Sequence, residues 1–206
     1  MSSGFETGDG LYAMVLAAGA ASRFGSAKQL VRVAGRPLLH NAVSRAVDVA
    51  GAATIVVLGA YATELAPLLR HTPATVVINR DWREGIGSSI RTGVGRLPAA
   101  CTGVMVMLAD QAAVTAEDLR RLVNAWKRQP EYVAAALYAG AVGVPAIFPR
   151  SRFSELAELR GDLGARKLLQ RNPDRLVRLP MESAAFDIDT PEDLLTLDAG
   201  QQNTRS

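Results

Sequence analysis

The residues best suited to binding or catalysis lie between positions 15 and 28. There an apolar run ends in the small residues 17–19, and two cationic residues follow, Arg23 and Lys28. Side chains this small let the backbone approach a ligand, and its N–H groups can then donate to oxygen atoms. Arg and Lys side chains neutralise phosphate charge. The pattern therefore indicates a polyphosphate site, although an ordinary strand–loop–helix join with surface cations has the same composition.

The spacing excludes two better-known phosphate loops. A Walker A loop needs four residues between its glycines and a lysine directly after the second glycine. Here five residues separate Gly19 from Gly25, and Lys28 comes later. The dinucleotide fingerprint G-x-G-x-x-G is absent from the stretch as well. The stretch therefore fits neither the P-loop nor the Rossmann class of nucleotide site.

A second candidate is Asp110, which follows the apolar run 103–108. Open α/β sheets bind their ligands at the carboxyl ends of strands. A carboxylate there, opposite the loop with the two cations, can hold Mg²⁺ against phosphate oxygens. The alternative is an Asp that caps the helix expected at 115–127. Thr115 with Asp118 already provides a capping box for that helix, which favours the metal site.

Two later segments carry weaker signals. Gly87 precedes Ser88 and Ser89, either of which can cap the helix that follows, and an uncrowded helix start can receive an anion. A simply capped helix explains the same residues, and the segment lacks the final Gly of a nucleophile elbow. Asp187, which we place at the end of a strand, can act as a second Mg²⁺ carboxylate beside Asp110.

These motifs resemble the signature of the nucleotidyltransferases that build molybdopterin dinucleotide cofactors. The strings L-A-A-G at 16–19 and R-x-G-x-x-K-x-L at 23–30 carry the resemblance, which extends over about 14–197. The cytidylyltransferase branch is the closer match, because the guanylyltransferase branch typically reads L-A-G-G. Two positions depart from the family pattern: Ala21 stands where the family usually has Ser, and Ala112 where it has Pro.

The resemblance implies a role for each motif. Arg23 would bind the leaving phosphates, Lys28 the α-phosphate, and Asp110 the Mg²⁺. The guanylyltransferase relatives carry Asn at the position of Asp187, so its role as a second metal ligand is a hypothesis from its placement. The nucleotide would lie against Leu16, Ala17, Ala18, Gly19, Gly87, Ser88 and Ser89. The acceptor would lie against Gly143, Pro145, Gly161, Asp162, Gly164, Ala165 and Arg166.

The expected reaction is the transfer of CMP from CTP to the terminal phosphate of molybdopterin cofactor, with release of pyrophosphate. Three alternatives remain open: a guanylyltransferase or sugar-phosphate nucleotidyltransferase, a glycosyltransferase that uses the D-x-D string at 187–189, and a non-catalytic carrier of the cofactor. The molybdoenzyme that receives the cofactor, or its insertion chaperone, is a further expected partner.

The elements that must position these residues alternate between strand and helix. The expected strands lie at 53–58, 75–78 and 103–108, and the expected helices at 38–50, 63–70 and 115–127. The segment 132–148 predicts one antiparallel excursion, with Pro145 on an edge strand. The fold class is therefore α/β: three α/β/α layers around a mostly parallel twisted sheet. The family resemblance implies that this sheet is the one shared by nucleotidyltransferases and GT-A-like enzymes. We expect a single domain at 12–198, with flexible tails at 1–11 and 199–206.

Composition narrows the partners. The chain of 206 residues has a net charge of +3 and a pI near 9.3, a basic excess too weak to predict nucleic-acid binding. Its single cysteine, Cys101, excludes an internal disulfide. No apolar run approaches the roughly 18–20 residues of a membrane span, and residues 1–11 lack the pattern of a signal peptide. We therefore expect a cytoplasmic protein that binds small anionic molecules.

Overall fold

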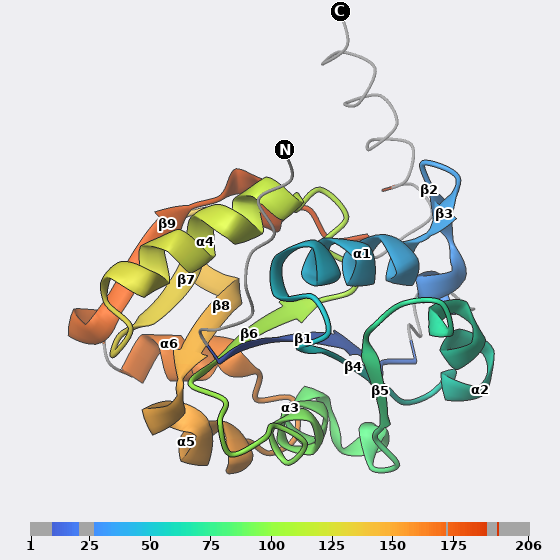
Figure 1. Cartoon of the computed structure of the whole chain (residues 1–206), viewed down its shortest axis with the longest axis horizontal. Coiled ribbons are helices and arrows are strands. Elements are labelled where there is room, and N and C mark those ends of the chain that lie inside the picture. Colours follow the sequence, from blue (N-terminus) through green and yellow to red (C-terminus); the bar gives the residue numbers. More distant parts are fainter. Residues whose placement is uncertain (1–9, 21–26, 172, 189–192, 194–206) are drawn as a thin grey trace, which may run out of the picture.

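A computed structural model describes residues 10–20, 27–171, 173–188 and 193, which form three layers (Figure 1). The middle layer is a seven-stranded sheet of order β5-β4-β1-β6-β8-β7-β9, and β2 and β3 form a separate short pair. The strands are β1 Leu11–Ala17, β2 Arg32–Val33, β3 Arg36–Pro37, β4 Thr54–Leu58, β5 Thr75–Ile78, β6 Gly103–Leu108, β7 Val133–Tyr138, β8 Ala141–Pro149 and β9 Leu176–Pro180.

Helices cover both faces of the sheet: α1 and α4 lie on one face, and α3, α5 and α6 on the other (Figure 1). The α-helices are α1 Leu38–Ala50, α2 Ala62–Leu65, α3 Ile86–Val94, α4 Ala116–Arg128, α5 Phe153–Ala157 and α6 Ala165–Arg171. The 3₁₀ turns are η2 Lys28–Leu30, η3 Ala66–Leu69, η4 Trp82–Glu84, η5 Arg150–Arg152, η6 Pro173–Arg175 and η7 Glu182–Ala185. In the part of the chain that is described, every helix is too short or too polar to cross a membrane.

Strand pairing confirms the mostly parallel sheet. β1 pairs in parallel with β4 and β6, and β4 with β5, while β8 runs against its neighbours β6 and β7. The hairpin of β7 and β8 is the predicted antiparallel excursion. Because parallel strands end at the same edge of a sheet, the carboxyl ends of β1 and β6 adjoin, with Leu16 opposite Leu108.

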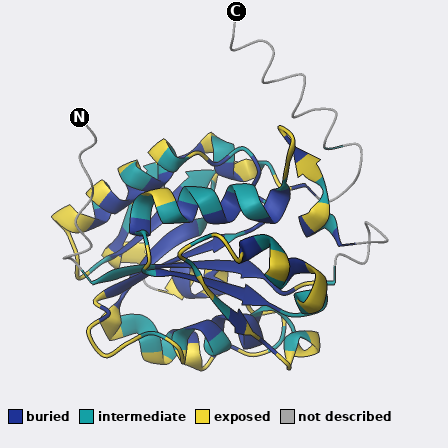
Figure 2. Cartoon of the chain, turned by 45° about the vertical axis from the view of Figure 1, so that its right-hand side comes forward, coloured by how far each residue is buried: buried dark blue, intermediate teal, exposed yellow. Residues whose placement is uncertain are grey.

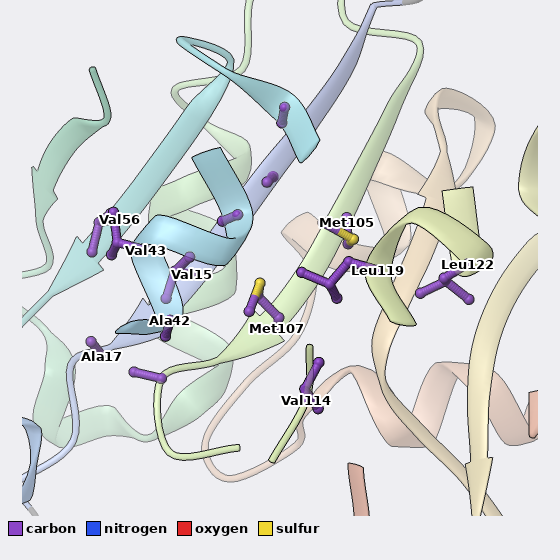
Figure 3. Close-up of a cluster of buried hydrophobic side chains, with 14 of the residues drawn as sticks. Val15, Ala17, Ala42, Val43, Val56, Met105, Met107, Val114, Leu119 and Leu122 are labelled. Atoms are coloured by element: carbon purple, nitrogen blue, oxygen red, sulfur yellow. The ribbon is translucent and has the colours of Figure 1, made fainter. Parts of the chain in front are cut away.

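The central strands are apolar throughout because helices bury both of their faces. One core lies between the sheet and α1 and α4, where Val15 and Met107 pack near Ala42 and Leu119 (Figure 3). The second core packs α3, α5 and α6 on the other face and includes Ile90. Figure 2 shows the buried strands in the middle and the exposed residues on the outer sides of helices and loops.

The predicted bounds and caps of individual elements are confirmed in some cases and wrong in others. β5 and β6 begin and end at the predicted residues, and Thr115 and Asp118 form the predicted capping box of α4. The helix expected at 63–70 is one α-helical turn followed by a 3₁₀ turn that contains Pro67, which lacks a backbone donor. The predicted serine cap of α3 is wrong, because the helix already begins at Ile86.

The prediction that Pro145 lies on an edge strand is also wrong. β8 lies between β6 and β7, and its register with β7 shifts, so that Ala135 faces Ala146 while Ala136 faces Gly143. Val144 and Pro145 are the extra residues of this bulge. A proline is tolerated there because bulged residues do not complete the ladder of hydrogen bonds.

Candidate functional site

The small-residue turn after β1 is braced by a glycine at the end of the neighbouring strand β4. The amide of Ala60 donates to the Ala18 carbonyl at 3.0 Å. A methyl group on Gly59 would lie 2.5 Å from that carbonyl oxygen and 2.7 Å from Cβ of Trp82. A methyl group on Gly19 would meet no atom of the described residues within 4 Å. The turn is therefore supported on its β4 side and open at Gly19, where a ligand can approach the backbone.

A buried glutamine fixes the same turn. Gln29 is 4% exposed, and its Nε2 donates to the carbonyl of Gly19 at 3.0 Å and to that of Ala17 at 3.4 Å. With these carbonyls engaged, the turn offers an incoming anion its N–H groups. No motif in the sequence pointed to Gln29; its one signal is its position directly after Lys28.

Lys28 and Asp110 form the polar centre of the site. Lys28 Nζ lies 2.7 Å from Asp110 Oδ2, with the side chains 14% and 21% exposed. The adjacency of β1 and β6 creates this pair, because Lys28 begins η2 after β1 and Asp110 follows β6. Lys28 Nζ also donates to the carbonyl of Ile188 at 3.0 Å. A partly buried ion pair is screened less than a surface pair, so it holds the segments after the two strands together.

The Asp110 carboxylate fits a divalent cation as an additional partner. Its Oδ1 is buried, and no described residue donates a hydrogen bond to it. A buried carboxylate oxygen without a donor is costly unless something binds it. Among the described residues no three His, Cys, Asp or Glu side chains cluster as metal ligands. Asp110, phosphate oxygens and water would suit Mg²⁺, which prefers oxygen ligands and usually keeps several waters.

Arg45 and Gln111 fix the loop that follows β6. Arg45 of α1 donates to the carbonyls of Gln111 at 3.3 Å and Ala112 at 2.8 Å, and burial lowers the pKa of its guanidinium. Gln111 is 1% exposed, and its Nε2 donates to the carbonyls of Val144 at 2.8 Å and Ala184 at 3.1 Å. These bonds restrain the loop without the family's proline at position 112.

The opposite wall of the site comes from η4 and the start of α3. The Arg83 guanidinium stacks over the Trp82 ring, 4.4 Å from its centroid, as a cation–π contact. Gly85 has a φ of 114°, and a methyl group there would lie 2.5 Å from both the Gly161 carbonyl and Asp162 Oδ1. The loop before α6 can therefore pack against this wall because residue 85 is glycine.

A salt bridge joins this wall to the loop before α6. Arg91 of α3 donates to both carboxylate oxygens of Glu84 and to the Leu159 carbonyl. The Gly161 amide donates to Glu84 Oε1 at 3.4 Å. The hydrogen bonds from Arg91 lower the pKa of Glu84 to about 2. The pair is therefore charged at neutral pH and holds 82–91 against 159–161.

These elements surround a cavity of about 410 Å³, within the size range of small-ligand sites. Its walls are the turn after β1, the Lys28–Asp110 pair, the segment 82–89 and Asp162. Eight of the predicted site residues line it: Leu16, Ala17, Ala18, Gly19, Lys28, Ser89, Asp110 and Asp162.

Two residues predicted to bind nucleotide have packing tasks instead of a place in the cavity wall. Ser88 is 1% exposed, and its Oγ accepts from Asn79 Nδ2 at 2.8 Å. The Gly87 amide donates to the Gly161 carbonyl at 2.9 Å, and a methyl group on Gly87 would crowd the backbone of residues 159–160. Arg23 lies outside the described residues, and its role stays a prediction.

Of the predicted acceptor residues at the start of α6, Gly164 lies next to the cavity wall. A methyl group on Gly164 would contact Ile86 Cγ2 at 3.4 Å. Ala165 is buried at the start of α6, and Arg166 is exposed. Gly161 and Gly164 therefore lie beside the 82–89 segment, and the contact of all four residues with an acceptor stays a prediction.

The other two predicted acceptor residues, Gly143 and Pro145, lie on β8. A methyl group on Gly143 would come within 2.2 Å of the Tyr138 hydroxyl, so the Tyr138 ring requires a glycine there. Burial raises the pKa of Tyr138; the charge of Asp187 adds to the rise and that of Arg166 opposes it. Tyr138, which no motif singled out, therefore packs against Gly143 and senses the charges of two predicted site residues, Asp187 and Arg166.

The prediction that Asp187 ends a strand is wrong. It follows η7 and is exposed. The next residue, Ile188, donates its amide to the Asp110 carbonyl at 3.1 Å, which brings the segment to the carboxyl end of β6. The role of Asp187 as a metal ligand stays a prediction.

A cavity at the carboxyl ends of β1 and β6, with a small-residue turn and a Lys–Asp pair, has the form expected of a nucleotidyltransferase. The MobA-like NTP transferase domain matches residues 13–176, and the chain belongs to that family. Membership confirms the family resemblance of the sequence motifs, and it implies a nucleotide substrate and the use of a divalent metal.

Relatives by sequence and by structure extend over most of the chain. Nicotine blue oxidoreductase of Paenarthrobacter nicotinovorans is 29% identical over 198 residues, which are 89% of this chain and 94% of that protein. The crystal structure of an Rv0371c homologue from Mycobacterium sp. strain JC1 superposes with a TM-score of 0.80 at 26% identity, covering 93% of this chain and 98% of the other.

Two further structures bear on the metal and the fold. The manganese complex of Rv0371c from Mycobacterium tuberculosis H37Rv has a TM-score of 0.72 at 29% identity, covering 91% of this chain and 97% of that one. Molybdopterin-guanine dinucleotide biosynthesis protein A from Archaeoglobus fulgidus has a TM-score of 0.68 at 19% identity, covering 93% and 99%. At that identity the likeness concerns the fold.

Replacing Glu84 by Gln should remove an acid-sensitive part of the stability. Folding lowers the pKa of Glu84 from 4.5 to about 2, so its charge stabilises the fold fully above pH 4.5 and loses this effect as the pH falls toward 2. The difference in Tm between wild type and E84Q, measured by circular dichroism, should be constant above pH 4.5 and shrink below it. A difference that stays constant down to the lowest pH would contradict this.

Replacing Lys28 by Met should tighten the binding of Mn²⁺ to the nucleotide-free protein. Lys28 Nζ occupies Asp110 Oδ2 and adds a positive charge that opposes a second cation. The Kd for Mn²⁺, measured by electron paramagnetic resonance, should fall several-fold in K28M. Asp110→Asn is the control and should lose the site. Weaker Mn²⁺ binding by K28M would mean that the cation does not compete with Lys28.

Proposed function

We propose that this protein transfers CMP from CTP to the terminal phosphate of molybdopterin cofactor, with Mg²⁺, and releases pyrophosphate. One observation carries the proposal: Lys28 and Asp110 meet at 2.7 Å beside the open small-residue turn. Such a corner offers backbone donors, a cation and a metal-binding carboxylate within one cavity. Those are the groups that a nucleoside triphosphate needs.

The proposed reaction is a direct displacement. An oxygen of the acceptor phosphate attacks the α-phosphorus of CTP, the bond from that phosphorus to the bridging oxygen of the β-phosphate breaks, and pyrophosphate leaves with the electron pair. No covalent protein intermediate is needed, because the acceptor phosphate is itself a nucleophile. The contribution of the protein is therefore orientation and charge stabilisation.

The residues of the cavity divide this task. Backbone N–H groups of the turn 17–19 would hold the nucleotide, Lys28 would stabilise the charge that develops on the α-phosphate, and Arg23 would bind the leaving phosphates. Asp110 would hold Mg²⁺, which supplies charge neutralisation along the triphosphate when it is bound. Arg166, exposed in the first turn of α6, would meet the acceptor.

The base is the least constrained part of the proposal. The L-A-A-G string supports CTP, and a guanylyltransferase or a sugar-phosphate nucleotidyltransferase would use the same cavity with another base or acceptor. A non-catalytic carrier of the cofactor would bind molybdopterin without consuming a nucleotide. One relative is named nicotine blue oxidoreductase, which is the name of a redox enzyme and not of a nucleotidyltransferase. Nucleotide consumption by this protein therefore has to be measured directly.

The deciding experiment incubates the protein with Mg²⁺, molybdopterin cofactor and each NTP in turn, and measures pyrophosphate. CTP should give the fastest release. Lys28→Ala and Asp110→Ala should each lower kcat by on the order of 10²–10³, the cost of losing one charge-stabilising group. Lys127→Ala, at the far end of α4, is the matched control and should behave as wild type. Wild-type turnover by K28A or D110A would contradict the proposed roles.

Replacing Ala18 by Gly tests the base. The Ala18 methyl lies on the cavity wall against Gly59, and its removal converts the string to the guanylyltransferase form. We expect the ratio of kcat/KM for GTP to that for CTP to rise in A18G. Ala46→Gly, in the middle of α1 and away from the cavity, is a control for the effect of a glycine on stability. An unchanged ratio would mean that Ala18 does not select the base.

A further inference from the structure

The backbone of Ile188 links the two charged residues of the site. Its carbonyl accepts from Lys28 Nζ at 3.0 Å, and its amide donates to the Asp110 carbonyl at 3.1 Å. The Asp110 carboxylate accepts from the same Nζ at 2.7 Å. The three residues therefore form a closed ring of hydrogen bonds, although Ile188 is 160 positions from Lys28.

The side chain of Ile188 keeps the backbone of this residue in place. It is 0% exposed and packs in a small cluster with Val33, Leu38 and Ala112, against which Phe186 also packs. Val33 belongs to the β2–β3 pair and Leu38 begins α1. The cluster thus anchors the segment before residue 189 to elements that follow Lys28 in the chain.

The same segment is also fixed at its other end. Gln111 Nε2 donates to the carbonyl of Ala184, which is 0% exposed. Residues 184–188 are therefore tied to the loop after β6 twice, once through Gln111 and once through Asp110. A segment held at both ends and by a buried side chain has few other conformations, so the Ile188 carbonyl is a preorganised acceptor.

We propose that Ile188 is a positioning residue for Lys28. A lysine amine sits on a flexible four-carbon stem with three rotatable donors, and its place must be restricted for catalysis, because a misplacement of about 1 Å can cost 10²-fold in rate. Asp110 restricts the amine from one side. The Ile188 carbonyl adds a second acceptor from another segment, so that an arriving phosphate meets an oriented amine. The catalytic task of Lys28 rests on the proposed function; the restraint itself does not.

The chain offers a direct readout of the restraint, because it contains three lysines, Lys28, Lys127 and Lys167. Lys28, 14% exposed and hydrogen-bonded, should react slowly with a limiting amount of acetic anhydride. Mass spectrometry can compare its acetylation rate with those of the other two in the same sample. In Ile188→Ala we expect the rate at Lys28 to rise several-fold relative to Lys127 and Lys167, and in Ile188→Val to rise less.

The matched control is Ile147→Ala. Ile147 is also 0% exposed, and it lies on β8 opposite Met105, away from the carboxyl end of β6. It should lower Tm as I188A does and leave the relative acetylation of Lys28 unchanged. Equal acetylation ratios in I188A and I147A would overturn the proposal. If I188A does not fold, the smaller change I188V decides, and a wild-type ratio in I188V would overturn it too.

Turnover gives a second, separate arm. With the substrate that wild type consumes, I188A should lose on the order of tenfold in kcat with little change in KM for the nucleotide, because the amine is misplaced rather than removed. I188V should restore most of the rate. If none of the NTPs gives pyrophosphate with the wild-type protein, the proposed function is wrong, and the acetylation experiment still tests the role of Ile188. Raised acetylation with unchanged kcat would overturn the positioning role.

Discussion

The ion pair between Lys28 and Asp110 is the constraint on which the site depends, and it exists because β1 and β6 are neighbours. From β1 the chain proceeds to β4 and β5 on one side, then returns to place β6 on the other. The strand order therefore reverses between β1 and β6, and open α/β sheets bind ligands in the crevice at such a reversal. The small-residue turn and the carboxylate lie on its two sides.

Two glycines allow the segments that form the cavity walls to pack closely. Gly59 leaves room for the Ala18 turn, and Gly85 for the loop at Gly161 and Asp162. Around these close contacts, buried amide and guanidinium groups donate to the backbone of the loops and hold them in place. Gln29 holds the turn after β1. The result is a preorganised corner, in which the charged groups are held in place by neighbours that do not themselves react.

The sequence predicts those parts of the fold that depend on local pattern. The apolar runs of β5 and β6, the capping box at Thr115 and the acid after β6 were all recoverable because propensity and spacing decide them. Lys28 could be expected near Asp110 because each follows the carboxyl end of a predicted strand, and such ends adjoin in a parallel sheet. Pro145 was misplaced because a lone proline does not reveal whether its strand is central or at an edge.

Gln111 and Ile188 could not be predicted as supporting residues, because each acts across a long separation in the sequence. Gln111 bonds to carbonyls 33 and 73 positions away, and Ile188 reaches Lys28 across 160. The sequence around Gln111 or Ile188 does not predict such a contact. The prediction that Ser88 caps α3 is wrong for another reason. Its sequence context suits a helix cap, but the helix starts two residues earlier and Ser88 is buried within it.

The most direct test of the account is a crystal structure with a non-hydrolysable CTP analogue and Mn²⁺, in which anomalous scattering locates the metal. The account predicts the triphosphate against the turn 17–19, Mn²⁺ coordinated by Asp110, and Lys28 Nζ in contact with the α-phosphate. A triphosphate bound elsewhere on the molecule, or a metal that does not contact Asp110, would contradict it.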